Sequence, residues 1–353
     1  MSEGPRVPRT QGFQGAQGAA GWRAAVASTP KVRAISRAKA RGIARGLRSK
    51  DFLSVLDLSH EELDDTLALA AQLKAERKQG RVSMTPLSGK HFALLFDKPS
   101  LRTKSTFTIA VRELGGDVID PAAEVALGSR ETVTDVARNL ERWVAGAIVR
   151  TFAQARLVEF AAAAPHLKVV NALTDEEHPC QAIADVLTLR EHLGDLRGRT
   201  VTFVGDGNNV AVSLAHAAVM LGMRVRVASP KGYELPKPII AECARVARWG
   251  GVVEVTNDPI AGVAGADAIY TDVWASMGQE EQADAREEIF SAFQVNEPLM
   301  DAAGPEALFL HCLPAHRGHE VTDAVMDSPQ SVVFDQSENR LHAQKALLAK
   351  LFA

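Results

Sequence analysis

The sequence predicts an α/β protein with two domains, each a doubly wound parallel sheet covered by helices. From residue 52 onward, short apolar runs of β type alternate with longer helical patterns, and this alternation is typical of parallel sheets. The 353 residues of the chain exceed what one ordinary core holds and suit two domains of roughly 100–200 residues each. We therefore expect two Rossmann-like domains joined by helices.

The strands and helices are expected in regular order along the chain. Short runs of apolar and β-branched residues predict strands at 92–96, 147–151, 169–173, 200–205, 224–229, 268–273 and 307–313. Helical patterns lie between them, at 131–143, 154–164, 178–193, 209–221 and 235–248. Glycine pairs at 115–116 and 250–251 mark helix ends. The stretch 191–200 divides the chain into two similar βα halves.

Composition excludes several classes of protein. The chain is 46% hydrophobic and 24% charged, without an apolar run long enough to cross a bilayer, so a membrane role is not expected. Its three cysteines, Cys180, Cys243 and Cys312, form no CxxC pair. Neither a disulfide framework nor a structural zinc site is therefore expected, and a reducing cytoplasm is the expected compartment.

Charge is unevenly distributed along the chain. Residues 1–50 hold eleven Lys or Arg against one acid, Glu3, a balance of +10, so the remaining residues carry −13 of the net charge of −3. An acidic folded part argues against nucleic acid as a partner. The basic segment has few large apolar residues and is expected to be disordered. A transit peptide is one interpretation, but the absence of a clear amphipathic stripe favours a dispensable tail.

Polar stretches follow the predicted strands, where ligands of open parallel sheets bind. They are PSLRT (99–103), Arg150, HPCQ (178–181), GDGNN (205–209), DVWASMG (272–278) and HCLP (311–314). Because the carboxyl ends of parallel strands lie at one edge of a sheet, we expect these stretches to form one site.

The first stretches suit an anionic substrate. Ser100, Arg102 and Thr103 would combine helix-start N–H groups, hydroxyls and a guanidinium fork into a phosphate cradle, although an ordinary serine cap with a surface arginine is the alternative. His178 and Gln181 lie on one face of a predicted first helical turn. The imidazole of His178 would stabilise a carbonyl oxygen that gains negative charge, and Gln181 would form a hydrogen bond with an amide nitrogen nearby. A histidine that only caps the helix is the alternative.

The later stretches favour a small polar ligand over NAD. Gly205 and Gly207 fit a dinucleotide fingerprint, but Val210 stands where close helix packing needs a small residue. Asp272 would receive an ammonium group, and the glycine-containing loop after it would close over the ligand. An ordinary turn or surface loop is the alternative in each case.

Taken together in this order, the motifs resemble the aspartate/ornithine transcarbamoylase family, and within it the ornithine carbamoyltransferases. PSLRT resembles the family's PS-x-RT loop, HPCQ its HPxQ, and DVWASMG its SMG loop; HCLPAHRG (311–318) and FDQSENRLHAQKALL (334–348) complete the set. The resemblance spans the chain after the basic tail. It implies the following division: a disordered tail at 1–50, a carbamoyl phosphate domain at 51–190, an ornithine domain at 191–335, and a last helix at 336–353 that packs back on the first domain.

The resemblance also implies roles for individual residues. Carbamoyl phosphate would bind to Ser100, Leu101, Arg102, Thr103, Arg150, His178 and Gln181. Ornithine would bind to Asn209, Asp272, Ser276, Met277, Cys312, Leu313 and Arg340. The catalytic residues would be Arg102, His178, Asp272 and Cys312.

The implied reaction is attack of the side-chain amine of ornithine on carbamoyl phosphate, giving citrulline and phosphate for arginine biosynthesis. Arg102, Thr103 and His178 would stabilise the oxyanion, and neither a metal nor an organic cofactor is expected. Cys312 would bind the α-amino end of ornithine together with Asp272 and help to orient the attacking amine. A buried structural cysteine is the alternative. The family also implies a homotrimer.

Two other functions stay open at this stage: a transcarbamoylase for another amine, such as putrescine or acetylornithine, and a non-catalytic paralogue. The SMG loop argues against the first, and the intact catalytic residues argue against the second. Five positions depart from the family pattern, one of them His319, which replaces a common Glu after HRG. Leu101 and Lys104 replace a frequent Thr and Arg, Val212 replaces a frequent His, and Ala126 stands where a neighbouring subunit often lends Gln or His to the phosphate.

Overall fold

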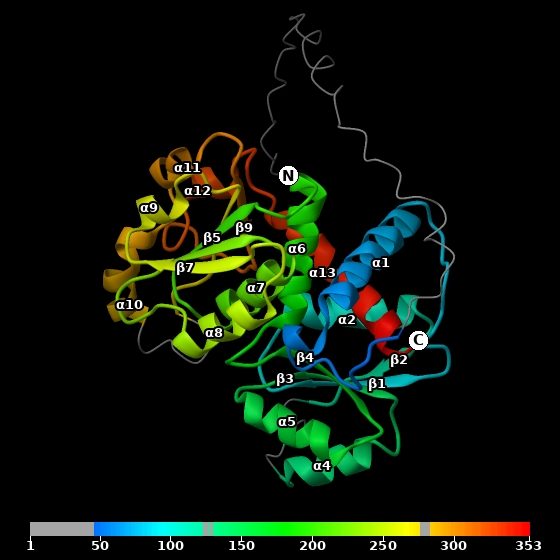
Figure 1. Cartoon of the computed structure of the whole chain (residues 1–353). Coiled ribbons are helices and arrows are strands. Elements are labelled where there is room, and N and C mark those ends of the chain that lie inside the picture. The colour runs from blue at the N-terminus through cyan, green and yellow to red at the C-terminus, as the bar shows by residue number, and fades with distance from the viewer. Residues whose placement is uncertain (1–45, 123–126, 128–129, 276–282) are drawn as a thin grey trace, which may run out of the picture. The chain divides into compact units, whose positions relative to one another are not determined.

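The protein contains two parallel β-sheets with helices packed against them (Figure 1). The computed structural model describes residues 46–122, 127, 130–275 and 283–353. Within them the strand order is β2-β1-β3-β4 in the first sheet and β7-β6-β5-β8-β9 in the second. The predicted α/β class with two doubly wound parallel sheets is confirmed. Most of the basic segment 1–50, together with Ala126, Ser276 and Met277, lies outside the described residues.

The first sheet is buried on both faces. Its strands are β1 (His91–Phe96), β2 (Asp117–Ile119), β3 (Gly146–Arg150) and β4 (Lys168–Leu173). Side chains alternate between faces along each strand, so Ala93 and Leu95 pack with α4 (Val133–Leu140) and α5 (Gln154–Ala163). Phe92 and Leu94 belong to the opposite core, which includes α1 (His60–Lys78) and α2 (Leu101–Glu113). Figure 1 shows the two helix pairs on opposite sides of the sheet.

The second sheet is also covered on both faces. Its strands are β5 (Thr200–Val204), β6 (Arg224–Ala228), β7 (Val252–Thr256), β8 (Ala268–Thr271) and β9 (Leu308–His311). One face packs on α7 (Asn209–Met220) and α8 (Lys237–Val246). The other face packs on α9 (Pro259–Val263), α11 (Glu297–Ala303) and α12 (Asp323–Met326). The helix α10 (Ala283–Phe290) precedes α11 in the chain.

Two strands were not predicted from the sequence. β2 has only three residues, and its two ends are exposed. β7 pairs with β6 as an edge strand, and its side chains are exposed or half-buried. Both strands therefore lack the apolar run by which the other seven were identified.

Two long helices link the sheets. They are α6 (Pro179–Leu193) and α13 (Val333–Leu351), and they pack against each other. α13 also packs on α1 and α2, where Lys345 forms an ion pair with Glu113 at 2.7 Å. The last helix therefore lies against helices that flank the first sheet. Within the described part of the chain, no helix combines the length and apolarity needed to span a bilayer.

The connections place a crevice at the carboxyl ends of the strands. In the first sheet the chain runs from β1 to β2 on one side and continues in β3 and β4 on the other. In the second sheet it runs from β5 through β6 to β7 and then crosses back to β8 and β9. Ligand sites of open α/β sheets lie at such reversals, here between β1 and β3 and between β5 and β8.

Candidate active site

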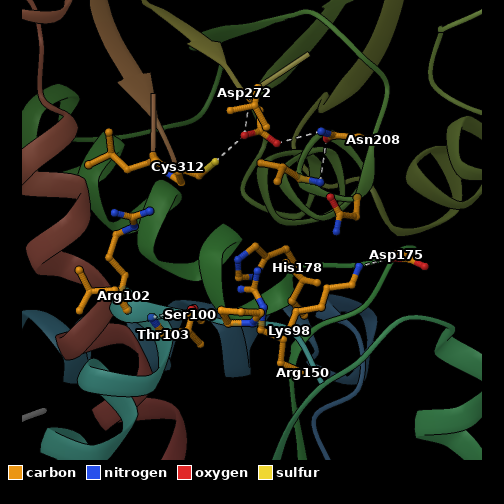
Figure 2. Close-up of a pocket in the computed structure, with 18 of the residues that line it drawn as sticks. Lys98, Ser100, Arg102, Thr103, Arg150, Asp175, His178, Asn208, Asp272 and Cys312 are labelled. Atoms are coloured by element: carbon orange, nitrogen blue, oxygen red, sulfur yellow. Dashed lines mark hydrogen bonds and ion pairs between the residues drawn. The ribbon is translucent and has the colours of Figure 1, made fainter. Parts of the chain in front are cut away.

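A pocket of about 450 Å³ lies at the carboxyl ends of the strands (Figure 2). Its volume is in the range of small-molecule sites. Most of the predicted site residues line it, namely Ser100, Leu101, Arg102, Thr103, Arg150, His178, Asn209, Asp272, Cys312, Leu313 and Arg340. The polar stretches that follow separate strands are therefore brought together, as the fold predicts.

The PSLRT stretch forms the start of α2. The hydroxyl of Ser100, the N-cap residue, accepts a hydrogen bond from the Thr103 N–H at 3.3 Å, so the serine caps the helix and lines the pocket at once. Thr103 is buried, and its hydroxyl accepts a hydrogen bond from the guanidinium of Arg340. This contact joins α2 to α13 at the wall of the pocket. By contrast, Leu101 is 78% exposed.

Three guanidinium groups gather at this end of the pocket, from Arg102, Arg150 and Arg340. Burial, followed by the charge of Arg340, lowers the pKa of Arg150 to about 10. The pKa values of Arg102 and Arg340 are also lowered, chiefly by burial. Since like charges in a buried site disfavour one another, an anion that accepts their hydrogen bonds would bind tightly here.

His178 lies beside Arg150 in the pocket (Figure 2). It occupies the N-cap position of α6, but its side chain makes no capping hydrogen bond, so the interpretation of a histidine that only caps the helix does not hold. Burial lowers the pKa of His178 well below its ordinary value, and the charges of Arg340 and Arg150 lower it further. The imidazole is therefore neutral at neutral pH and can donate one hydrogen bond to a carbonyl oxygen.

A carboxylate and a thiol face the arginines from the second sheet (Figure 2). The thiol of Cys312 donates to Oδ1 of Asp272 at 2.9 Å, and the Asn208 side chain donates to Oδ2 at 2.9 Å. Burial, followed by the nearby charge of Asp272, raises the pKa of Cys312 well above its ordinary value. Because the thiolate is the nucleophilic form, this protonated cysteine is suited to hydrogen bonding and not to covalent catalysis.

The pocket end around Cys312 does not suit a metal ion. The side chains of Asp272, His311 and Cys312 bring possible ligand atoms within 4.8 Å of one another. However, Nδ1 of His311 accepts the Leu313 N–H at 2.9 Å, and Nε2 lies 3.1 Å from the carboxylate of Glu320. Both ring nitrogens of His311 are thus engaged, so this side chain offers no free nitrogen to a metal ion.

Gln181 does not line the pocket. Its side chain is buried, and Nε2 donates to Oδ1 of Asp185 at 2.8 Å. The same carboxylate accepts hydrogen bonds from Gln336 at 2.6 Å and from the hydroxyl of Tyr270 at 3.2 Å. The expected contact of Gln181 with substrate therefore stays a prediction. Ser276 and Met277, the other predicted residues absent from the lining, lie outside the described residues.

Four further polar residues line the pocket: Asp206 and Asn208, which belong to the predicted GDGNN stretch, and Lys98 and Asp175, which lie outside the predicted stretches. Lys98 forms an ion pair with Asp175 at 2.7 Å, and its ammonium lies 4.2 Å from the centre of the Phe152 ring. All four follow strands β1, β4 or β5 by a few residues. The rule that identified Asp206 and Asn208, polar side chains after strand ends, would have identified Lys98 and Asp175 too.

Comparison with known protein families gives two matches that together span most of the chain. The model described as the carbamoyl-P binding domain of aspartate/ornithine carbamoyltransferase matches residues 50–191. The model described as the Asp/Orn binding domain of the same family matches residues 197–351.

Individual relatives agree with these matches. An ornithine carbamoyltransferase of Symbiobacterium thermophilum is 49% identical over 310 residues, covering 87% of this chain and 99% of the relative. One from Geobacillus stearothermophilus is 51% identical over 304 residues, covering 86% and 97%. Among solved structures, the ornithine carbamoyltransferase of Pyrococcus furiosus is 46% identical with a TM-score of 0.82, covering 86% of this chain and 97% of that one.

Proposed function

Because the chain belongs to the aspartate/ornithine carbamoyltransferase family, we propose that it transfers the carbamoyl group of carbamoyl phosphate to L-ornithine. The products are L-citrulline and phosphate, and the reaction serves arginine biosynthesis. One observation carries the proposal. Three guanidinium groups and a neutral imidazole share a pocket with a carboxylate that accepts a hydrogen bond from a thiol. An anionic carbamoyl donor and a cationic amino acid are the matching substrates.

Carbamoyl phosphate binds at the arginine end. Ser100, Thr103 and the main chain at Leu101 hold the phosphate together with the forks of Arg102 and Arg150. His178 donates to the carbonyl oxygen, and Gln181 contacts the carbamoyl amide. These residues come from the proposed carbamoyl phosphate domain, 51–190.

Ornithine binds at the opposite end. The carboxylate of Asp272 receives the α-ammonium group, and Cys312 and Leu313 flank it. Asn209 completes the binding site together with Arg340, which lies near both Thr103 and Cys312, and Ser276 and Met277 contact the bound amino acid. Most of these residues come from the proposed ornithine domain, 191–335, and Arg340 comes from the last helix, 336–353. This arrangement points the side-chain amine toward the carbamoyl carbon.

The chemistry follows from these positions. The neutral side-chain amine attacks the carbamoyl carbon, and its lone pair forms the new C–N bond. The carbonyl oxygen becomes an oxyanion, which Arg102, Thr103 and His178 stabilise. When the oxyanion collapses, the C–O bond to phosphate breaks, Arg102 and Arg150 neutralise the leaving group, and phosphate takes the proton that the amine releases. The scheme requires no metal or organic cofactor because the leaving group is already activated.

Product formation from carbamoyl phosphate tests this proposal directly. The purified protein is given ornithine, putrescine, acetylornithine or aspartate in parallel, and each carbamoylated product is measured. Turnover with ornithine alone supports the proposal. Turnover with another amine refutes the acceptor, and the absence of turnover with all four refutes the transfer reaction.

We also propose that the protein acts as a homotrimer in the cytoplasm. The trimer rests on the family resemblance, and the compartment on the three cysteines, all of which are free thiols. Light scattering coupled to size-exclusion chromatography should give three times the chain mass of 37.9 kDa. A monomer mass at working concentration would refute the trimer.

A further inference from the structure

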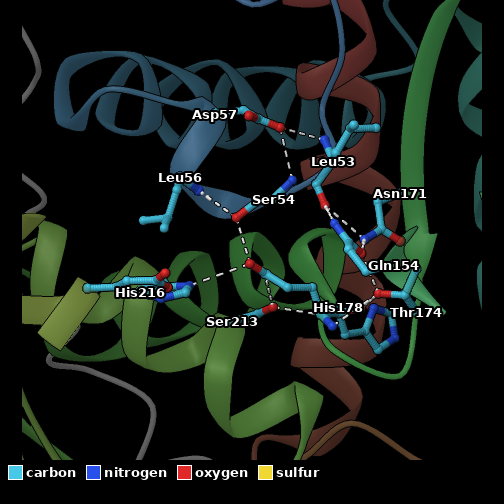
Figure 3. A network of polar contacts seen from close by, with 12 residues as sticks. Leu53, Ser54, Leu56, Asp57, Gln154, Asn171, Thr174, His178, Ser213 and His216 are labelled. Carbon is cyan, nitrogen blue, oxygen red and sulfur yellow. Dashed lines mark hydrogen bonds and ion pairs between the residues drawn. The ribbon is translucent and has the colours of Figure 1, made fainter. Parts of the chain in front are cut away.

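A buried carboxylate lies directly behind the pocket. Glu177 precedes His178 in the chain, is only 8% exposed and does not line the pocket. Its Oε1 accepts a hydrogen bond from the hydroxyl of Ser54 at 2.6 Å, and its Oε2 accepts one from the hydroxyl of Ser213 at 2.5 Å (Figure 3). Since buried charge is costly unless its oxygens are paired, these two contacts make the position tolerable.

The direction of these hydrogen bonds is fixed by the main chain. The Ser54 hydroxyl accepts the Leu56 N–H at 3.1 Å, and the Ser213 hydroxyl accepts the His178 N–H at 2.9 Å. Each hydroxyl carries one proton and donates it to Glu177. A continuous chain of hydrogen bonds therefore runs from the main chain of His178 through Ser213 to Glu177 and on to Ser54.

The two serines come from different parts of the fold. Ser54 caps η2 (Val55–Asp57), within the residues that match the carbamoyl-P binding domain. Ser213 lies on α7, within the residues that match the Asp/Orn binding domain. The carboxylate of Glu177 thus connects both domains at the residue next to His178.

The turn before His178 is held at further points. The Thr174 N–H donates to the Glu177 carbonyl at 2.9 Å, and the Glu177 N–H donates to the Thr174 hydroxyl at 3.1 Å. The side chain of Asn209 donates to the Thr174 carbonyl at 2.6 Å. His216 also faces Glu177, but Nδ1 lies 3.6 Å from Oε1, beyond a hydrogen bond. The serines are therefore the hydrogen-bond partners that fix the carboxylate.

We propose that Glu177 is a positioning residue for His178. Its carboxylate orients the Ser213 hydroxyl, which holds the His178 main chain and so places the imidazole against the carbamoyl carbonyl. The proposal rests on the proposed function, because the place of His178 matters only if it stabilises the oxyanion.

A double-mutant cycle with a matched control tests the inference. Glu177→Gln keeps the shape but leaves one serine proton without an acceptor, and it should lower kcat by about tenfold to a hundredfold. Glu176→Gln makes the same change at the exposed neighbour and should keep kcat within about twofold, as surface changes do. In a His178→Ala background, Glu177→Gln should lower kcat by less than a further factor of about two. The effects of residues that act through one another are not additive.

The outcomes separate the inference from the proposed function. Equal losses in both backgrounds, or a Glu177→Gln variant as active as the control, would overturn the positioning role while leaving the transferase intact. Ser213→Ala removes the same link without changing charge and takes the place of Glu177→Gln if that variant does not fold. If the wild-type protein shows no turnover, the proposed function fails. In that case, crystal structures of the wild type and of Glu177→Gln still test the inference. If the His178 ring occupies the same place in both, the positioning role is overturned.

Discussion

Replacement of Asp185 by asparagine should flatten the pH dependence of stability. Asp185 is fully buried on α6. Its Oδ1 accepts from Gln181 and Gln336, and its Oδ2 accepts from the hydroxyl of Tyr270. An asparagine keeps the oxygen for the two glutamines and offers its NH₂ to the tyrosine oxygen. The exchange therefore preserves the packing and removes only the charge.

The size of the effect follows from the pKa of this group. Burial raises the pKa of Asp185 from 3.8 to about 7, so the folded state holds this proton more tightly than the unfolded state. The stabilisation that the Asp185 proton gives the folded state is therefore fully present below about pH 4 and is lost as the pH rises through about 7. At roughly 1.4 kcal/mol per pKa unit, the wild-type protein should lose about 2–3 kcal/mol between pH 5 and pH 8.5 that the asparagine variant keeps.

Urea unfolding of both proteins at pH 5, 7 and 8.5 measures this difference. Subtraction of the two curves removes the titration of all other groups. Asp301→Asn, the same exchange at an exposed position, serves as the control and should follow the wild type at each pH. A gap between wild type and Asp185→Asn that is constant from pH 5 to 8.5 would refute the reasoning.

Three further predictions concern the pocket. Cys312→Ser keeps a donor to Asp272 and should retain most of kcat/KM for ornithine in steady-state assays, whereas Cys312→Ala should lose about tenfold; equal losses would contradict the hydrogen-bonding role. Because burial and Asp272 raise the pKa of the Cys312 thiol, iodoacetamide at pH 8 should label it slowly, as followed by mass spectrometry. Rapid labelling would show a thiolate and contradict the raised pKa. Arg102→Lys loses the bidentate fork and should raise KM for carbamoyl phosphate about tenfold or more, so an unchanged KM would exclude Arg102 from the phosphate site.

The fold was predictable wherever a strand carries its own apolar run. All residues of β5 and β8 are buried, and both were identified. β7 was missed because Glu254 and its exposed neighbours interrupt the run. Strand order could not be predicted, because parallel pairing depends on contacts between distant segments and leaves no local pattern.

The candidate site was predictable to the extent that it follows strand ends. That rule brought Arg102, His178 and Asp272 to one pocket. It gave no indication of which side chains would pair across the fold. The guanidinium of Arg340 reaches Thr103 across 237 positions of sequence, and nothing in the local sequence indicates that the Glu177 carboxylate is buried between two serines.

The origin of Arg340 in the last helix has a consequence for biosynthesis. The ribosome completes β1, β3 and His178 well before it reaches Arg340, and domains begin to fold as they emerge. At that stage the hydroxyl of Thr103 lacks its guanidinium partner, and the apolar core still lacks Leu347 and Leu348. A nascent chain therefore carries Ser100, Arg102, Thr103 and Arg150 of the pocket lining before it carries Arg340. We therefore expect catalytic competence only after α13 has left the ribosome and docked on α1, α2 and α6.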